Sequence, residues 1–68
     1  MAWSWRYEAA DGTRLPPPEG ADLTFPSQAD AETWVGETWR DLLGSGVHQV
    51  VLLDGDAEVY GPMGLSAP

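Results

Sequence analysis

Apolar and polar positions alternate through the first residues of the chain. This alternation, with a period of two, predicts a half-buried strand over residues 2–10. Large aromatics share one face and polar side chains the other: Trp3, Trp5 and Tyr7 against Ser4, Arg6 and Glu8.

A short hairpin is predicted next. Asp11-Gly12 suits a two-residue turn, because both residue types tolerate positive φ angles. Residues 13–15 then return as a second strand. Pro16-Pro17-Pro18 ends this strand, since proline lacks the N–H that a sheet requires. We therefore expect residues 16–24 to form an extended proline-rich loop, and a ligand for a polyproline-binding domain is the alternative.

The clearest element is an amphipathic helix over residues 27–43. Ser27 is placed to cap its N-terminus, and Asp30 follows at the capping-box position. Gly36 in the middle indicates either the close approach of another backbone or a tolerated defect. Gly44 and Gly46 are typical of a helix end. One face is apolar at helical spacing: Ala31, Trp34, Val35, Thr38, Trp39, Leu42 and Leu43.

A second hairpin follows the helix. Residues 47–53 are rich in valine and leucine and predict a third strand, which Asp54-Gly55 connects to a fourth strand over residues 57–61. Pro62 is expected to end that strand and to leave residues 63–68 as a flexible tail.

A two-residue turn divides this hairpin into an apolar face and a mixed face. The apolar face, expected to lie against the helix, carries Val50, Leu52, Ala57 and Val59. The mixed face carries Val51, Leu53, Glu58 and Tyr60. A three-residue loop at Asp54-Gly55-Asp56 is the alternative, and it would place Val51, Leu53 and Val59 on one face.

The order strand, strand, helix, strand, strand predicts an α+β fold. Residues 1–68 are expected to form one small domain, a small antiparallel ββαββ sheet with one helix packed on one face. We expect the helix to pack on Trp3, Trp5, Val50, Leu52 and Val59. One helix covers only one face, so the other is predicted to lack an intramolecular cover. Its residues form a candidate interaction surface: Arg6, Glu8, Val51, Leu53, Glu58 and Tyr60.

Composition narrows the classes of partner. The 68 residues contain four tryptophans, eleven acids, three arginines and no lysine, for a net charge of -8. Binding to phosphate backbones needs clustered basic residues, so no direct nucleic-acid binding is expected. An acidic surface keeps a small domain soluble and steers it towards basic protein surfaces. The acids are scattered over every element, which disfavours mimicry of nucleic acid.

The cysteine content and the hydropathy of the chain indicate the cellular compartment in which the protein is expected. The chain has no cysteine, which removes disulfides and thiolate metal sites and is typical of a reducing cytoplasm. No apolar run approaches the ~18 residues of a membrane span, and the N-terminus lacks the pattern of a signal peptide. We expect a cytoplasmic protein without membrane association.

No motif points to catalysis. His48 is the one histidine, and the nearby Ser45 lies in a glycine-rich turn without a nucleophile-elbow pattern. The acidic run from Asp54 to Glu58 departs from the calcium-loop pattern after two ligands, and a hairpin turn explains it. No glycine-rich phosphate loop is present. We therefore expect a protein that is not an enzyme, with no catalytic, cofactor-binding or metal-binding residues and no cofactor.

Several segments together resemble a group of short, acidic, uncharacterised proteins of high-GC actinobacteria. They are residues 3–8, residues 25–32 with Trp34, residues 39–43 and residues 59–63. The resemblance spans nearly the whole chain. It implies a stand-alone bacterial cytosolic protein and carries no activity or functional residues.

The function that remains is a small acidic, non-catalytic protein-binding or regulatory accessory module. Its partner is expected to be a protein with a basic or mixed surface, and Glu32, Glu37 and Asp41 on the helix are candidates to meet basic groups. The alternative is a self-associating, dimeric structural protein that uses the uncovered sheet face.

Overall fold

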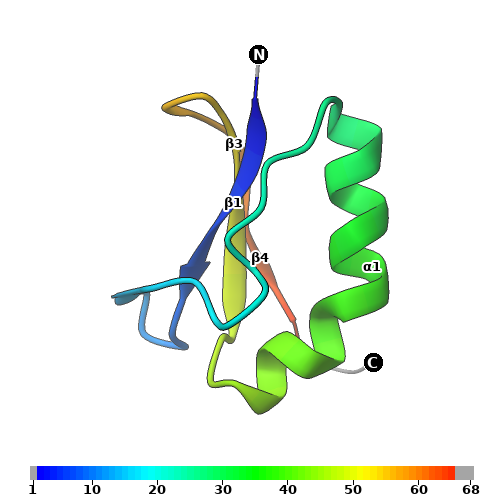
Figure 1. Ribbon diagram of the computed structural model, residues 1–68. Helices are drawn as coiled ribbons and strands as arrows, with labels where there is room; N and C mark the ends of the chain where they lie inside the picture. The colour runs from blue at the N-terminus through cyan, green and yellow to red at the C-terminus, as the bar shows by residue number, and fades with distance from the viewer. Residues whose placement is uncertain (1, 66–68) are drawn as a thin grey trace.

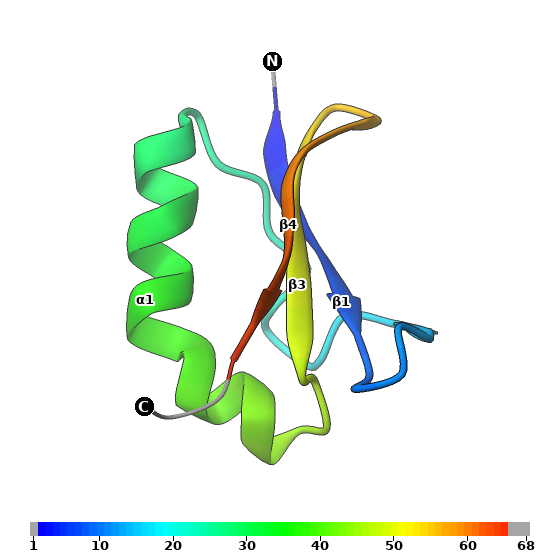
Figure 2. The same ribbon diagram turned by 180° about the vertical axis from the view of Figure 1, so that it is seen from behind.

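The computed structural model describes residues 2–65, which form a four-stranded antiparallel sheet with one helix packed on one face (Figures 1 and 2). The elements are β1 (Trp3–Glu8), β2 (Arg14–Leu15), α1 (Gln28–Gly44), β3 (Gln49–Asp54) and β4 (Ala57–Gly64). The strand order across the sheet is β2-β1-β3-β4. The predicted α+β fold is confirmed.

Helix α1 begins where its capping residue predicts. Ser27 has an extended backbone, with φ -147°, and its side chain accepts a hydrogen bond from the Asp30 N–H at 3.2 Å. At the other end, the Ser45 N–H donates to the carbonyls of Asp41 and Leu42. The helix therefore spans residues 28–44, one residue beyond the prediction at its C-terminal end, with Ala31, Val35 and Leu42 buried.

Two side chains of β1 tie the helix and the proline-rich loop to the sheet. The buried Trp5 indole donates from Nε1 to the carbonyl of Ala31 in the first turn of α1, at 3.0 Å. The buried Tyr7 hydroxyl donates to the carbonyl of Ala21 at 2.8 Å. Each ring fills the core while its polar tip is hydrogen-bonded, as a buried donor requires.

The segment between β2 and α1 is held at a second point. Phe25 forms a β-bridge with Trp3, in which the Trp3 N–H donates to the Phe25 carbonyl at 3.0 Å and the reverse bond measures 2.7 Å. The segment thus runs between the sheet and α1 (Figure 1) and is fixed there through Ala21 and Phe25.

The first hairpin has a three-residue loop in place of the predicted two-residue turn. The Gly12 N–H donates to the Ala9 carbonyl at 3.0 Å, and the Ala9 N–H donates to the Thr13 carbonyl at 2.8 Å. Gly12 has φ +88°, so a turn followed by a left-handed glycine closes the loop. The Asp11 carboxylate accepts from the Thr13 N–H at 2.9 Å and supports this arrangement.

The second hairpin keeps the predicted register only near its turn. Asp54 pairs with Ala57 and Leu53 with Glu58, which leaves a two-residue loop with Gly55 at φ +62°. Beyond this point the register shifts twice, so that Leu52 pairs with Tyr60 and Val50 with Met63. The six residues of β3 therefore face eight residues of β4.

These bulges correct the predicted core. Val59 was expected under the helix, but it is the extra residue opposite Leu52 and is 46% exposed. Trp3, Trp5, Val50 and Leu52 do belong to or pack against the core cluster. The alternation of the sequence could not show this, because a bulge moves every later residue out of the expected phase.

Gly61 allows β4 to lie close against β3 at the second bulge. It has φ +122°, and a Cβ atom there would lie 2.9 Å from the Val50 carbonyl oxygen and 3.0 Å from the Val51 Cα. The peptide between Gly61 and Pro62 is cis. Pro62 lies inside β4 and does not end it, since an edge strand tolerates a missing N–H.

The expected tail is partly built into the fold. Met63 and Gly64 complete β4, and Leu65 is buried in the core, with its N–H donating to the His48 carbonyl at 3.0 Å. The expectation of a flexible segment is therefore wrong for these three residues, and its remainder, residues 66–68, lies outside the described residues.

A Tyr7→Phe substitution tests the anchoring of the loop. It should lower the free energy of unfolding by about 1–2 kcal/mol at neutral pH, because the Ala21 carbonyl loses its buried partner. Burial raises the pKa of Tyr7 above its ordinary value of 10.0, so the folded state opposes ionisation and the wild type loses stability as pH rises beyond that value. Urea unfolding should show the gap to Tyr7→Phe narrowing at high pH.

The matched control is Tyr60→Phe, which alters an exposed side chain and should change stability by less than about 0.5 kcal/mol. Equal stability of wild type and Tyr7→Phe at neutral pH would contradict a role for the buried hydroxyl, and a gap that is constant with pH would contradict the raised pKa of Tyr7.

A Gly36→Ala substitution should stabilise the protein by about 0.5–1 kcal/mol. A Cβ atom at this helical position meets nothing within 4 Å, so the glycine marks no close approach of another backbone. Alanine restricts the unfolded chain and favours the helix. Thermal or urea unfolding measures the change, and a destabilised variant would show that the glycine has a role in the fold.

Candidate interaction surface

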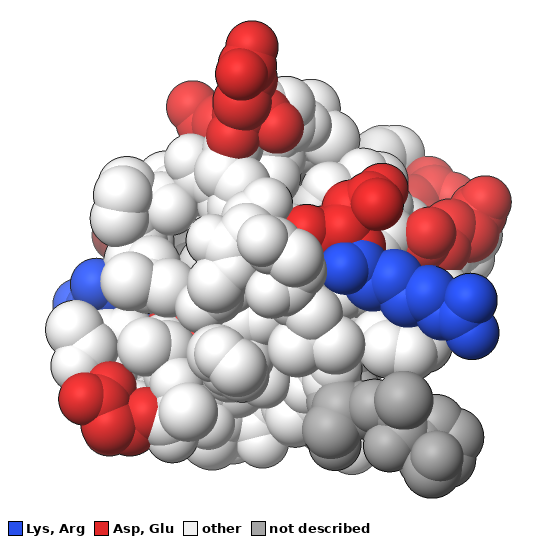
Figure 3. Space-filling model, turned by 90° about the horizontal axis from the view of Figure 1, so that it is seen from below, with Lys and Arg blue, Asp and Glu red and all other residues white. Residues whose placement is uncertain are grey.

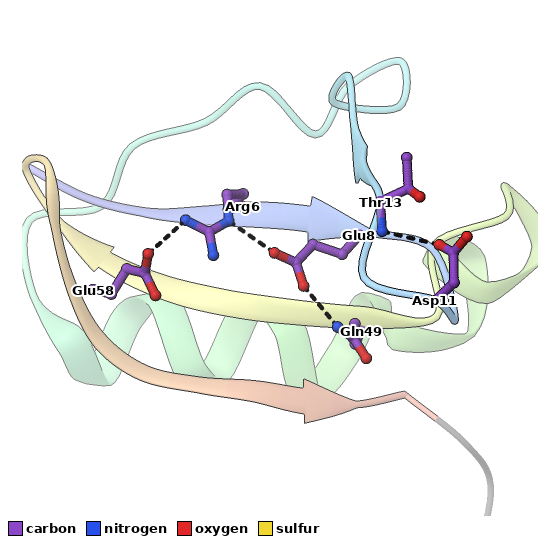
Figure 4. Close-up of polar contacts among 6 residues, drawn as sticks. All are labelled: Arg6, Glu8, Asp11, Thr13, Gln49 and Glu58. Carbon is purple, nitrogen blue, oxygen red and sulfur yellow. Dashed lines mark hydrogen bonds and ion pairs between the residues drawn. The ribbon is translucent and has the colours of Figure 1, made fainter.

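The sheet face opposite α1 carries a chain of linked polar side chains (Figure 4). The Arg6 guanidinium on β1 donates from Nε to the Glu8 Oε2 and from Nη1 to the Glu58 Oε2, both at 2.9 Å. The other Glu8 oxygen accepts from the Gln49 amide at 2.6 Å. Because Gln49 lies on β3 and Glu58 on β4, this polar network connects three strands.

The environment of these groups stabilises their charged forms. Glu8 is only 5% exposed, and each of its carboxylate oxygens has a hydrogen-bond partner. The bond from Gln49, and then the Arg6 charge, lower the pKa of Glu8. Arg6 likewise lowers the pKa of Glu58, and the two carboxylates raise the pKa of Arg6. The charges of Arg6, Glu8 and Glu58 therefore pair with one another within the molecule.

Val51 lies beneath this network. It is the cross-strand neighbour of Arg6 and is 2% exposed, although it is absent from the core cluster on the helix side. The Gly61 backbone approaches it from β4. The prediction that this face lacks an intramolecular cover is therefore wrong at Val51 and Glu8, because the polar side chains and the bulged strand enclose them.

The six predicted surface residues separate into two groups. The structure brings Arg6, Glu8 and Glu58 together over Val51, and Leu53 is partly buried between its neighbours Ser4 and Glu58. Tyr60 was wrongly assigned to this face, because the bulge pairs it with Leu52, a residue of the core cluster; it is 60% exposed at the sheet edge. The sequence contained one signal for the network, the spacing of Arg6 and Glu8 on one strand face. Its partners Gln49 and Glu58 depend on the strand register.

Exposed apolar groups gather instead on β4. This strand lies at a free edge of the sheet, and its first six residues are exposed, including Val59 and Tyr60. A shallow hollow of about 570 Å³ is lined by residues 58–63, which we call the β4 surface. Pro62 was expected to end the strand, whereas Gly61-Pro62 is a signal that could have indicated an irregular edge strand.

Charge is spread over the surface outside the network. Two of the eleven acids, Glu8 and Glu58, form salt bridges, and within residues 2–65 the salt bridges involve only these two and Arg6. Arg40 lies over the Trp39 ring at 5.1 Å. On the face seen in Figure 3, acidic side chains stand in separate groups around an uncharged centre. Arginine side chains lie on the same face, on two sides of it.

His48 and Ser45, which were considered as catalytic residues, make hydrogen bonds that belong to the fold. His48 is exposed, and its backbone N–H donates to the Glu8 carbonyl at 2.9 Å. The Ser45 hydroxyl donates to the Asp41 carbonyl at 3.1 Å. From Ala2 to Leu65, no three histidines or acids are grouped as metal ligands. Over the same residues, no helix has the length and apolar character needed to cross a membrane.

A Glu8→Gln substitution tests whether the polar network stabilises the fold. The pKa of Glu8 is lowered in the folded state, so its stabilisation is present above the ordinary value of 4.5 and is lost as pH falls through the lowered value. The variant should therefore be less stable than wild type at pH 7, and the difference should shrink in acid. Urea unfolding at several pH values measures it.

Glu37→Gln, an exposed position on α1, is the control and should leave stability nearly unchanged at pH 7. A Glu8→Gln variant with wild-type stability at pH 7 would show that the network contributes nothing.

The chain matches no protein-family model, no curated protein and no solved structure.

Proposed function

We propose that the protein is a non-catalytic protein-binding module that docks a partner along the β4 surface. The observation that carries this proposal is the exposure of Val59 and Tyr60, side by side on a free sheet edge. Apolar side chains with charges at their border are typical of association sites. Here Glu58, paired with Arg6 and still largely exposed, forms the polar border.

The contacts would be made mainly by side chains. Two bulges and Pro62 interrupt the row of backbone hydrogen-bond groups along β4. Such irregularities protect edge strands from continuous pairing with another strand. A tyrosine on such an edge offers a large contact area and a hydroxyl, and aromatic side chains dominate the energetics of many interfaces.

The partner is proposed to have a basic or mixed surface. The net charge of -8 and the many acids outside the polar network support this choice, because complementary charge raises association rates and disfavours acidic partners. Binding of this kind weakens as salt increases, since exposed charges are screened.

Self-association is the second candidate, and it rests on the same strand. In a symmetric dimer the β4 surface would face its own copy, and Val59 and Tyr60 would be buried in both chains. The acidic net charge opposes it, because two copies repel one another.

Affinity capture with a paired variant tests the proposal. Val59→Ser with Tyr60→Ser should abolish recovery of a specific partner from bacterial lysate at low salt, because it removes the exposed apolar groups. Leu23→Ser is the matched control, since Leu23 is 42% exposed and lies in the loop before α1. It should recover the partner as the wild type does, and high salt should release that partner.

Light scattering at increasing concentration distinguishes self-association. A dimer that Val59→Ser with Tyr60→Ser disrupts would favour the second candidate. Recovery of the same partner by the paired variant would overturn a docking role for β4.

A further inference from the structure

A groove lies between the proline-rich loop and the C-terminal half of α1. One recess, of about 150 Å³, is lined by residues 18–21 of the loop and by Trp34, Thr38, Asp41, Leu42 and Ser45 of α1 and its cap. A second hollow, of about 400 Å³, is lined by residues 15–19 together with Ser45 and Val47. Pro18, Glu19 and Ser45 line both, so the two hollows border one another.

The walls of this groove are fixed by core contacts. The Ala21 carbonyl holds the Tyr7 hydroxyl, and the Ala21 N–H donates to the Pro18 carbonyl at 2.9 Å. On the helix side, the Trp34 ring packs against Phe25 and Tyr7, at centroid distances of 5.6 and 6.5 Å. A groove that is already formed costs little ordering on binding.

Negative charge converges on the groove from three sources. Asp41 lies in the last turn of α1, at the negative end of the helix dipole, and this turn has no basic residue. Glu19 lies on the loop wall. No arginine is among the residues that line either hollow. An acid at a helix C-terminus is unfavourable for folding, which makes Asp41 a poor choice for stability alone.

We propose that this groove binds an arginine side chain on an apolar segment of a partner protein. The guanidinium would stack on the partly exposed Trp34 ring and be held by the Asp41 and Glu19 carboxylates. Arginine fits better than lysine, because a planar guanidinium both stacks on an indole and bonds to two carboxylates. Apolar neighbours of the arginine would contact Leu15 and the prolines at positions 16–18 in the second hollow.

This site goes beyond the proposed docking on β4. It has no lining residue in common with the β4 surface, and its walls come from the loop and the helix. Either site can therefore fail a test while the other passes.

The probe is the peptide acetyl-Leu-Arg-Leu-amide, added to the ¹⁵N-labelled protein at low salt. Its control contains citrulline, which keeps the shape of arginine and removes the charge. We expect shifts concentrated at the Trp34 indole and the amides of Gly20, Thr38, Asp41 and Ser45. The citrulline peptide should bind much more weakly, because it forms no charge-assisted bonds.

Glu19→Gln with Asp41→Asn should weaken arginine-peptide binding about tenfold, as two partly exposed charge contacts each contribute about threefold. The matched control is Glu32→Gln with Asp56→Asn, which removes the same charge at exposed positions outside the groove. It should bind as the wild type does. Val59→Ser with Tyr60→Ser should also bind normally, which separates this site from β4.

Three results would overturn the proposal. The first is a set of shifts scattered over acidic residues throughout the chain, the second is equal weakening by both charge-removing pairs, and the third is equal binding of the citrulline peptide. Spermidine is a further probe: shifts at the groove as large as those from the arginine peptide would also overturn the proposal, because the site would then accept any small polycation, and much smaller shifts would support it.

Discussion

The inward-facing aromatics of β1 organise this protein, because each is a large apolar body that ends in a hydrogen-bond donor. Trp5 reaches the first turn of α1 and Tyr7 reaches the proline-rich loop, each through a backbone carbonyl. A buried donor without a partner costs free energy, so the helix and the loop have one favourable position relative to the strand. In a 68-residue chain without cysteine, these contacts take the place of disulfide cross-links.

The outward-facing residues of β1 shield part of the sheet face that the helix leaves uncovered. One helix covers one face of the sheet, and Val51 on the other face would otherwise be exposed to water. Its cross-strand neighbour Arg6 is held there by carboxylates from β1 and β4, and Val51 is only 2% exposed. Long polar side chains can shield apolar surface in this way while their charged ends stay paired. The consequence is that Val51 and Glu8 on this face are buried, and the exposed large apolar groups of the sheet are Val59 and Tyr60 on β4.

The two proposed docking surfaces differ in character. The β4 surface is shallow and presents Val59 and Tyr60 on an irregular edge. The groove beside α1 is narrower, has an indole in its wall and has acids on both sides. Both are consistent with an acidic module that recognises basic or mixed protein surfaces, and they would contact different parts of a partner.

The sequence by itself determined the order of elements, the inner faces of β1 and α1 and the capped start of the helix. These features depend on residues close together in the chain, where period, capping and turn chemistry act. Tertiary structure decided the rest. The two bulges in β4 moved Val59 out of the core, and the strand register brought Gln49 and Glu58 to Arg6 and Glu8. Leu65 joined the core because β4 continued through Pro62. Each of these outcomes depends on how distant strands pair, and a shift of one residue reverses the side to which every following side chain points.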